Sequence, residues 1–80
     1  MATYLKKSIY SEKHYKLCGL LKNARIEAGF TQIDIAYKLG KHQSFVAKYE
    51  GGERRLDVIE LMEITKALNL SVKEVLSVIS

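Results

Sequence analysis

The sequence contains few of the features that mark secreted, membrane-spanning or repetitive proteins. It has no proline or tryptophan, one cysteine and no apolar run of about 18 residues. Because Cys18 has no second cysteine to pair with, an internal disulfide is excluded and a reducing, cytoplasmic setting is expected. The first residues lack the apolar block of a signal peptide, and no membrane-spanning segment is expected.

The remaining composition is that of one small globular domain with uneven charge. Of the 80 residues, 48% are hydrophobic, which is too many for a disordered chain. The net charge is +4, but residues 1–55 carry 11 Lys and Arg against 5 Asp and Glu, whereas residues 56–80 carry 2 against 4. The basic part suits either an ordinary solvated surface or a polyanionic partner, and the asymmetry favours the partner modestly.

The spacing of the apolar residues predicts a series of five short helices. The first spans residues 11–28 and is followed by Gly29 as a C-cap. A capping residue followed three positions later by an acidic residue predicts the start of three others, at Thr31, Asp57 and Ser71. The last helix is expected to pack inward through Val72 and Leu76. Strand patterning is nowhere sustained in the sequence.

The segment 31–51, TQIDIAYKLGKHQSFVAKYEG, has the pattern of two short helices joined by a tight turn. Gly40 stands where the chain must leave the first helix with a positive φ, and the small Ala36 stands where the helices would cross. The residues expected on the inner faces are Ile35, Ala36, Leu39, Val46 and Tyr49. This is the geometry of a DNA-binding helix-turn-helix. An isolated pattern of this kind is a weak signal, because any corner between two helices can mimic it.

Further segments in register extend that pattern along most of the chain. They are Leu20 with Arg25, EAGFTQ (27–32), IAYKLG (35–40), QSFVAKYEGGERRLD (43–57) and LMEITKALNLSVKEVL (61–76). With these segments, residues 17–76 resemble the Xre-type helix-turn-helix domain of phage repressors and Cro proteins. The resemblance implies an all-α fold. It is a compact five-helix, phage-repressor-like DNA-binding domain over residues 11–80, with the second and third helices as the helix-turn-helix. Residues 1–10 are expected to be a tail, either frayed or partly ordered.

The resemblance implies that the third helix enters the major groove of double-stranded DNA with its N-terminal end toward the bases. The candidates for base contact are its outward side chains, which are Gln43, Ser44, Ala47 and Lys48, with Phe45 to one side. A glutamine can bond bidentately to adenine, and an alanine can meet a thymine methyl. For Phe45, contact with DNA is favoured over shielding the edge of the core, because Val46 and Tyr49 already fill the inward face. The alternative to base contact for the other outward residues is that they are simply the exposed polar face of a short helix.

The contacts to the DNA backbone implied by the resemblance surround this helix and come from Gln32, Lys41, His42, Arg54 and Arg55. Gln32 opens the second helix, whose free N–H groups suit a phosphate, and family precedent has it also support Gln43. Lys41 and His42 depart from the small apolar residue and the Ser or Thr that are common there. Either they add donors for DNA or they are tolerated surface variants. Internal ion pairing is an equal alternative for Arg25, with Glu50 as partner, and for Arg55 in preference to Arg54.

The expected assembly is a homodimer on a palindromic operator, because one domain of this size covers a single half-site. The candidate dimer interface is the last helix, through Val75, Val78 and Ile79; the alternative is that these residues complete the domain's own core. The expected function is sequence-specific DNA binding by a small transcriptional regulator, with repression as the leading mode. Such a protein would lie in the cytoplasm and at the nucleoid when bound to DNA.

Other functions agree less well with the residues. His14 and Cys18 stand four residues apart, but without a third partner they make neither a metal site nor an activated nucleophile. No enzyme activity, metal or other cofactor is therefore expected, and no small-molecule ligand, since there is no room for a separate ligand-binding domain. Two other uses of the fold stay open. One is an antitoxin that binds an operator and, through residues 1–10, a toxin protein. The other is a protein-binding adaptor that no longer touches DNA.

Overall fold

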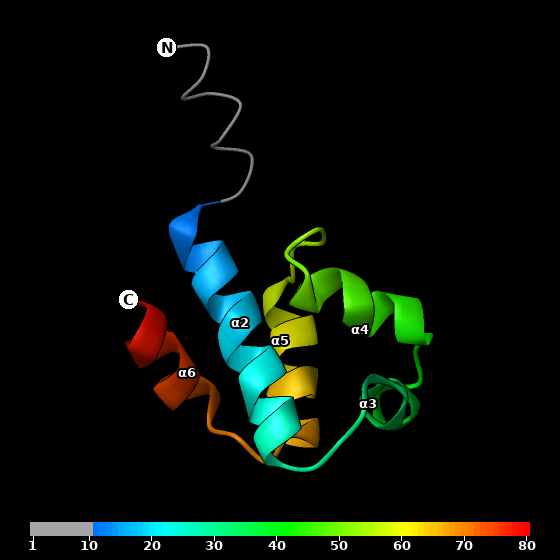
Figure 1. Cartoon of the computed structure of the whole chain (residues 1–80). Coiled ribbons are helices and arrows are strands. Elements are labelled where there is room, and N and C mark those ends of the chain that lie inside the picture. The colour runs from blue at the N-terminus through cyan, green and yellow to red at the C-terminus, as the bar shows by residue number, and fades with distance from the viewer. Residues whose placement is uncertain (1–10) are drawn as a thin grey trace, which may run out of the picture.

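The computed structural model describes residues 11–80, which form five α-helices joined by short turns (Figure 1). The helices are α2 (Glu12–Glu27), α3 (Gln32–Leu39), α4 (Gln43–Glu50), α5 (Val58–Ala67) and α6 (Val72–Ile79). The predicted all-α fold, with five helices in this order, is confirmed over these residues. The tail expected at residues 1–10 lies outside the described part of the chain.

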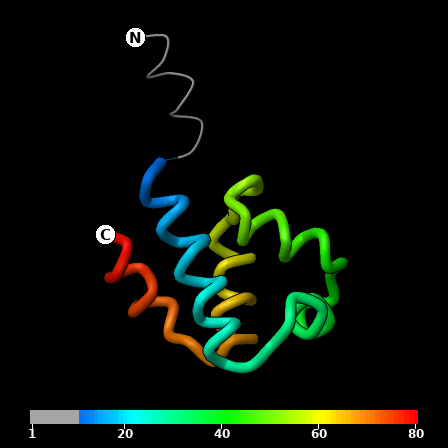
Figure 2. The backbone as a smooth tube through the Cα atoms, in the orientation of Figure 1, coloured from blue at the N-terminus to red at the C-terminus, as the bar shows by residue number. Residues whose placement is uncertain are grey.

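Helix α2 runs through the middle of the molecule, and the other helices are arranged around it (Figure 1). Helix α6 packs on one side of α2 and α4 on the other, while α5 contacts both α3 and α6. Figure 2 shows the chain leaving α2 in a wide turn to α3, which is seen nearly end-on, before α4 returns toward the centre. The pair α3 and α4 therefore forms one side of the molecule, and α6 forms the opposite side.

The core lies where α2, α3, α4 and α5 meet. The large side chains with no exposure at all are Leu21, Ile35, Val46, Tyr49 and Ile64. Burying one such side chain contributes about 1.5–3 kcal/mol, and helices this short are not stable without tertiary packing. All five residues predicted on the inner faces of the helix-turn-helix pack into this core, so that prediction is confirmed.

The turn between α3 and α4 closes at Gly40, whose φ is +67°. Its N–H donates to the Tyr37 carbonyl over 3.1 Å, and the next N–H, that of Lys41, donates to the Ala36 carbonyl over 2.9 Å. Any residue with a Cβ would cost about 1–2 kcal/mol in this left-handed conformation. The predicted end of the helix at Gly40 is therefore confirmed in conformation as well as in position.

Reciprocal hydrogen bonds cap α3 and α5, as the sequence predicts. The Thr31 hydroxyl accepts from the Asp34 N–H over 3.0 Å, and the Asp34 carboxylate accepts from the Thr31 N–H over 2.8 Å. Asp57 and Glu60 repeat this arrangement at α5, with bonds of 2.7 and 3.0 Å. Caps of this kind contribute about 0.5–2 kcal/mol each, so they fix where the helices begin.

The same carboxylates make stability depend on acid. The hydrogen bond from the Thr31 N–H lowers the pKa of Asp34, and the Arg54 guanidinium, followed by the Asp57 N–H, lowers the pKa of Glu60. A carboxyl whose pKa is lowered by folding stabilises the fold above its unfolded pKa of about 4 and loses that contribution as the pH falls through the folded value. We therefore expect the free energy of unfolding to fall as the solution becomes acidic, and to fall less in Asp34→Asn and Glu60→Gln.

Denaturant unfolding between about pH 7 and pH 2 measures this loss. The matched control is Glu63→Gln, which makes the same chemical change at an exposed position of α5. If the free energy of unfolding falls by the same amount between these pH values in the wild type and in both cap variants, the caps do not cause the loss.

Helix α6 turns a different face inward from the one expected. Val75 is 3% exposed and Leu76 is 43% exposed, so the expectation that Leu76 packs inward is wrong. Residues three and seven positions apart share one helix face, and Val72, Val75 and Ile79 form the inner face on that spacing. Val75 is therefore buried within the chain itself and cannot serve as a surface for a second copy, whereas Val78 remains 54% exposed.

Candidate nucleic-acid interface

Helix α4 divides cleanly into a buried and an exposed face. Val46 and Tyr49 have no exposure and anchor the helix to the core. The side chains expected to point outward are exposed, and they are Gln43, Ser44, Ala47 and Lys48. The major groove of B-DNA is about 12 Å wide and admits one helix, so this face has the size and the polar chemistry that groove reading requires.

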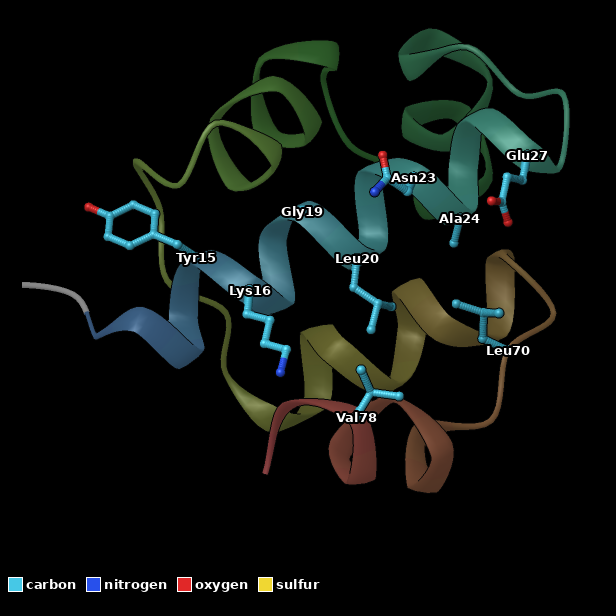
Figure 3. A pocket seen from close by; sticks show the side chains of 9 residues that line it. All are labelled: Tyr15, Lys16, Gly19, Leu20, Asn23, Ala24, Glu27, Leu70 and Val78. Carbon is cyan, nitrogen blue, oxygen red and sulfur yellow. The ribbon is translucent and has the colours of Figure 1, made fainter.

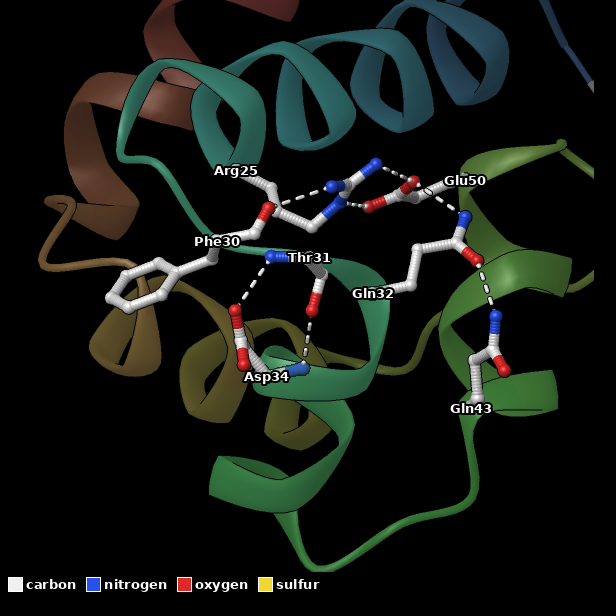
Figure 4. Close-up of polar contacts among 7 residues, drawn as sticks. All are labelled: Arg25, Phe30, Thr31, Gln32, Asp34, Gln43 and Glu50. Carbon is white, nitrogen blue, oxygen red and sulfur yellow. Dashed lines mark hydrogen bonds and ion pairs between the residues drawn. The ribbon is translucent and has the colours of Figure 1, made fainter.

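The first residue of α4 is held by a side chain of α3 (Figure 4). Gln43 Nε2 donates to Gln32 Oε1 over 3.2 Å, and Gln32 Nε2 donates in turn to Glu50 Oε1 over 3.0 Å. The support of Gln43 by Gln32 that the family resemblance implied is therefore present. Within residues 11–80, this bond uses one N–H of the Gln43 amide. Its second N–H and its oxygen are available to a ligand.

Behind Gln32 lies a nearly buried ion pair between α2 and the end of α4. Arg25 donates through Nε to Glu50 Oε2 over 2.6 Å and through Nη2 to Glu50 Oε1 over 3.0 Å, and its Nη1 donates to the Phe30 carbonyl over 2.8 Å (Figure 4). The two side chains are 11% and 2% exposed. The hydrogen bonds to Glu50 raise the pKa of Arg25 although burial opposes this. The structure thus shows the internal role that the sequence left open for Arg25.

Phe45 lies half-buried at the edge of the core and is flanked by two cations. Its ring meets Tyr49 edge to face, with the ring centres 5.5 Å apart. The Arg54 guanidinium lies 4.7 Å and the Lys41 ammonium 5.4 Å from its ring centre. Each cation–π contact is worth about 0.5–1 kcal/mol at exposed sites. Of the two expected roles of Phe45, the structure shows the shielding of the core, and it adds the placement of the two cations.

Arg54 also belongs to a bidentate ion pair. Its Nη1 and Nη2 donate to the two carboxylate oxygens of Glu60 over 2.9 and 2.8 Å. The sequence favoured Arg55 over Arg54 for internal pairing; the structure shows such a pair at Arg54, and the pairing of Arg55 stays a prediction. The Arg54 side chain nevertheless remains 40% exposed, so it can reach a phosphate without leaving Glu60.

A shallow open hollow lies at the N-terminal end of α4, on the side of Phe45 and Arg54. Its lining comes from Gly40, Lys41, His42, Ser44, Phe45, Lys48, Glu53 and Arg54. Lys41, Lys48 and Arg54 are basic, His42 adds an imidazole, and Glu53 is the acidic member. His42 occupies the N-cap position of α4 without a side-chain capping bond to this helix. A polyanion backbone is the ligand that this hollow suits, because cations and helix N–H groups face the same space.

Two acidic residues complete this surface in ways that sequence reasoning missed. Glu50 was expected to face Arg25 but not to bind Gln32, and Glu60 was expected to cap α5 but not to hold Arg54. The signal for Glu50 was available, since it stands seven residues after Gln43 and therefore on the same face of α4. The link from Glu60 to Arg54 depends on the path of the loop before α5, which carries no periodic pattern.

His14 and Cys18 lie together on α2, beside the loop at Gly52. The Cys18 thiol is 2% exposed and lies 3.7 Å from His14 Nε2, which also contacts the Gly52 carbonyl at 3.1 Å. Burial raises the pKa of the Cys18 thiol and thereby favours its protonated form. Within residues 11–80, no three His, Cys, Asp or Glu side chains gather where a metal could bind, and no helix there is long and apolar enough to cross a membrane.

The sequence and fold match known proteins of one kind. The family model for helix-turn-helix domains matches residues 21–75. An XRE-family like protein from Pseudomonas syringae pv. tomato str. DC3000 is 41% identical over 94% of this chain and 92% of its own, with a TM-score of 0.83. No protein of curated function matches the sequence.

Restriction-modification controller proteins are also similar. A point mutant of the controller protein C.Esp1396I is 30% identical over 89% of this chain and 90% of its own, with a TM-score of 0.79. The same controller protein has been solved as a tetramer in complex with its natural 35 base-pair operator; that chain is 28% identical, with a TM-score of 0.79, over 88% of this chain and 92% of its own. The TM-scores show that these structures share one overall fold with this chain.

Proposed function

Because the chain belongs to the Xre-type helix-turn-helix family, we propose that it regulates transcription by binding a specific double-stranded operator, with α4 in the major groove. The observation that carries the proposal is Gln43, which is exposed at the N-terminal end of α4 and held in place by Gln32. A base-reading side chain must be both accessible and oriented, and Gln43 is both. Repression is the mode we favour, because a bound domain blocks the DNA it covers.

Base reading falls to the exposed face of α4. The Gln43 amide offers one donor and one acceptor, which match N7 and N6 of adenine. The Ser44 hydroxyl and the Lys48 ammonium add donors on the same face, and the Ala47 methyl suits a thymine methyl. Phe45 lies beside them, where its exposed part is positioned to meet a sugar or a methyl group.

Backbone phosphates are bound on either side of this face. The cations Lys41 and Arg54, fixed over the Phe45 ring, meet one strand together with His42 at the start of α4. Gln32 opens α3, where free helix N–H groups attract a phosphate of the other strand. Arg55 is exposed in the loop before α5 and extends the basic surface.

The two kinds of contact should respond differently to mutation. We expect wild-type affinity to fall steeply as salt rises, because phosphate contacts release counterions. Gln43→Ala should relax preference at one base pair at a cost of about 1–3 kcal/mol, whereas Lys41→Ala should weaken all sequences alike and reduce the salt slope by about one. Binding-site selection from a random duplex library, followed by titration at several salt concentrations, measures both effects.

Ile59→Ala, an exposed change on α5 outside α4 and outside the groove between α2 and α6, is the control for this experiment and should alter neither quantity. An affinity for DNA that does not change with salt concentration would contradict the proposed binding to nucleic acid. A selected site that is the same with and without Gln43 would show that Gln43 reads no base.

We further propose that the chain acts as a homodimer on a palindromic site and that α6 forms the interface. A shallow groove runs between α2 and α6, with apolar side chains of Leu20, Ala24, Leu70 and Val78 in it and Lys16 and Glu27 at its rim (Figure 3). Leu76 and Val78 are 43% and 54% exposed, and Ile79 is half-buried. Such an apolar face is a liability for a single small domain unless a second copy covers it.

Val78→Glu is expected to convert dimers into monomers, because it places a charge in the proposed contact. Val58→Glu is the matched control, since Val58 is 62% exposed and lies on α5. Sedimentation velocity over a range of concentrations gives the result. Monomers in Val78→Glu and dimers in Val58→Glu are expected, and dimers that persist in Val78→Glu would place the interface elsewhere.

A further inference from the structure

Gln43 and Glu50 are the first and last residues of α4, and Gln32 of α3 joins them. Seven residues at 1.5 Å each separate them by about 10 Å along the helix axis. The two ends are bridged by hydrogen bonds of 3.0 Å from Gln32 to Glu50 and 3.2 Å from Gln43 to Gln32 (Figure 4). The base-reading end of α4 is therefore connected through polar side chains to the ion pair with Arg25.

The chemistry of these groups permits only one direction of hydrogen bonding. Both oxygens of Glu50 accept from the Arg25 guanidinium, and a carboxylate paired in this way acts only as an acceptor. Gln32 must then turn its NH₂ group toward Glu50, which leaves its amide oxygen facing Gln43. Because an amide oxygen can only accept, Gln43 must turn its own NH₂ group toward Gln32.

This direction fixes the order of the groups that Gln43 presents to DNA. One N–H is committed to Gln32, so the second N–H and the amide oxygen occupy defined places on the exposed side. A base edge such as that of adenine has one acceptor and one donor side by side. An amide rotated by half a turn would exchange the two places and lose the match to that base.

We propose that Glu50 is a positioning residue for base recognition, whose carboxylate sets the orientation of the Gln43 amide through Gln32. The proposal rests on the proposed function, since it concerns how the same surface reads DNA. Glu50 itself has a side chain that is 2% exposed and does not contact the bases. Its role is to make one of two amide orientations the only one that is compatible with a buried negative charge.

The test uses two variants and a matched control in the full chain. Glu50→Gln replaces the carboxylate by an amide that both donates and accepts, so that either direction becomes possible. Gln32→Met removes the connection but leaves the ion pair of Arg25 and Glu50 intact. Glu60→Gln makes the same carboxylate-to-amide change in the other bidentate ion pair, that with Arg54, which has no connection to Gln43.

Affinity is measured for duplexes that differ only at the base pair whose preference Gln43→Ala abolishes. We expect Glu50→Gln and Gln32→Met to reduce the preference there about tenfold, within the range that one bidentate contact supplies, and to leave other positions unchanged. Glu60→Gln should keep the full preference. If Glu50→Gln does not fold, as shown by circular dichroism, the double variant Arg25→Met/Glu50→Leu takes its place, because it removes the carboxylate without leaving an unpaired buried charge.

Uniform weakening on all duplexes, with preference retained in both variants, would overturn the proposal while the proposed function stands. If the wild-type protein binds no duplex, the proposed function itself is wrong, and the proposal for Glu50 fails with it. A second readout is independent of DNA. The side-chain amide proton shifts of Gln43 in the free protein should move toward those of an unbonded amide in Gln32→Met but not in Glu60→Gln. Shifts that do not move in Gln32→Met would also overturn the proposal.

Discussion

Arg25→Met is expected to lower the free energy of unfolding by about 3–5 kcal/mol, the usual cost of removing one partner from a buried ion pair. Arg25 supplies two of the three hydrogen bonds to the Glu50 carboxylate, and Glu50 is 2% exposed. Without the guanidinium, a buried negative charge keeps only the Gln32 amide, and the Phe30 carbonyl also loses its donor. Denaturant unfolding followed by circular dichroism measures the loss. A small domain has roughly 5–15 kcal/mol in total, so the midpoint should fall sharply.

The structure offers two controls for this result. Arg54→Met breaks the other ion pair, whose arginine is 40% exposed, and should cost about 1 kcal/mol or less because water screens an exposed pair. The double variant Arg25→Met/Glu50→Leu should recover most of the loss, since no charge is left unpaired. Equal losses in Arg25→Met and Arg54→Met would show that burial adds nothing to the first pair.

The fold was readable from the sequence because its determinants are local. The capping pairs at Thr31 and Asp57 and the glycine at position 40 each act within a few residues, and each appears in the structure where the sequence places it. Apolar spacing then specified which faces of α3 and α4 are buried. The spacing failed only in α6, where Val75 and Leu76 are neighbours of similar hydrophobicity. Which of the two turns inward depends on how the short helix docks on α2, and no local pattern encodes that.

The candidate site was readable in part for a related reason. The exposed residues of α4 follow from the helix period once its inner face is known. The series of hydrogen bonds from Arg25 through Glu50 and Gln32 to Gln43 does not follow from the helix period. Its residues come from α2, α3 and α4 and meet only after the helices pack. The ion pair of Arg54 with Glu60 was missed for the same reason, since it depends on the path of the irregular loop before α5.

Gly52→Ala is expected to lower the free energy of unfolding by about 2–4 kcal/mol, from backbone strain together with overpacking. Gly52 has a φ of +83°, and a Cβ built on it would lie 2.5 Å from Cε1 and 2.7 Å from Cδ1 of the Tyr15 ring. The Tyr15 ring meets His14 edge to face and Tyr15 is 52% exposed, so the distance that the ring can withdraw into solvent sets the size of the overpacking part. The backbone is held in place, since the Gly52 carbonyl contacts His14 Nε2 at 3.1 Å and its N–H donates to the Tyr49 carbonyl over 3.1 Å.

Gly29→Ala separates the two causes, because Gly29 has nearly the same φ, +82°, but no atom within 4 Å of a built Cβ. It should cost only the strain, about 1–2 kcal/mol. The additional loss in Gly52→Ala then measures the contact with Tyr15, and Tyr15→Ala in that background should abolish the additional part. Thermal and denaturant unfolding of the wild type, Gly29→Ala, Gly52→Ala, Tyr15→Ala and Tyr15→Ala/Gly52→Ala give the comparison. Equal losses at the two glycines would mean that the ring moves freely and that α2 does not hold the loop leading to Arg54.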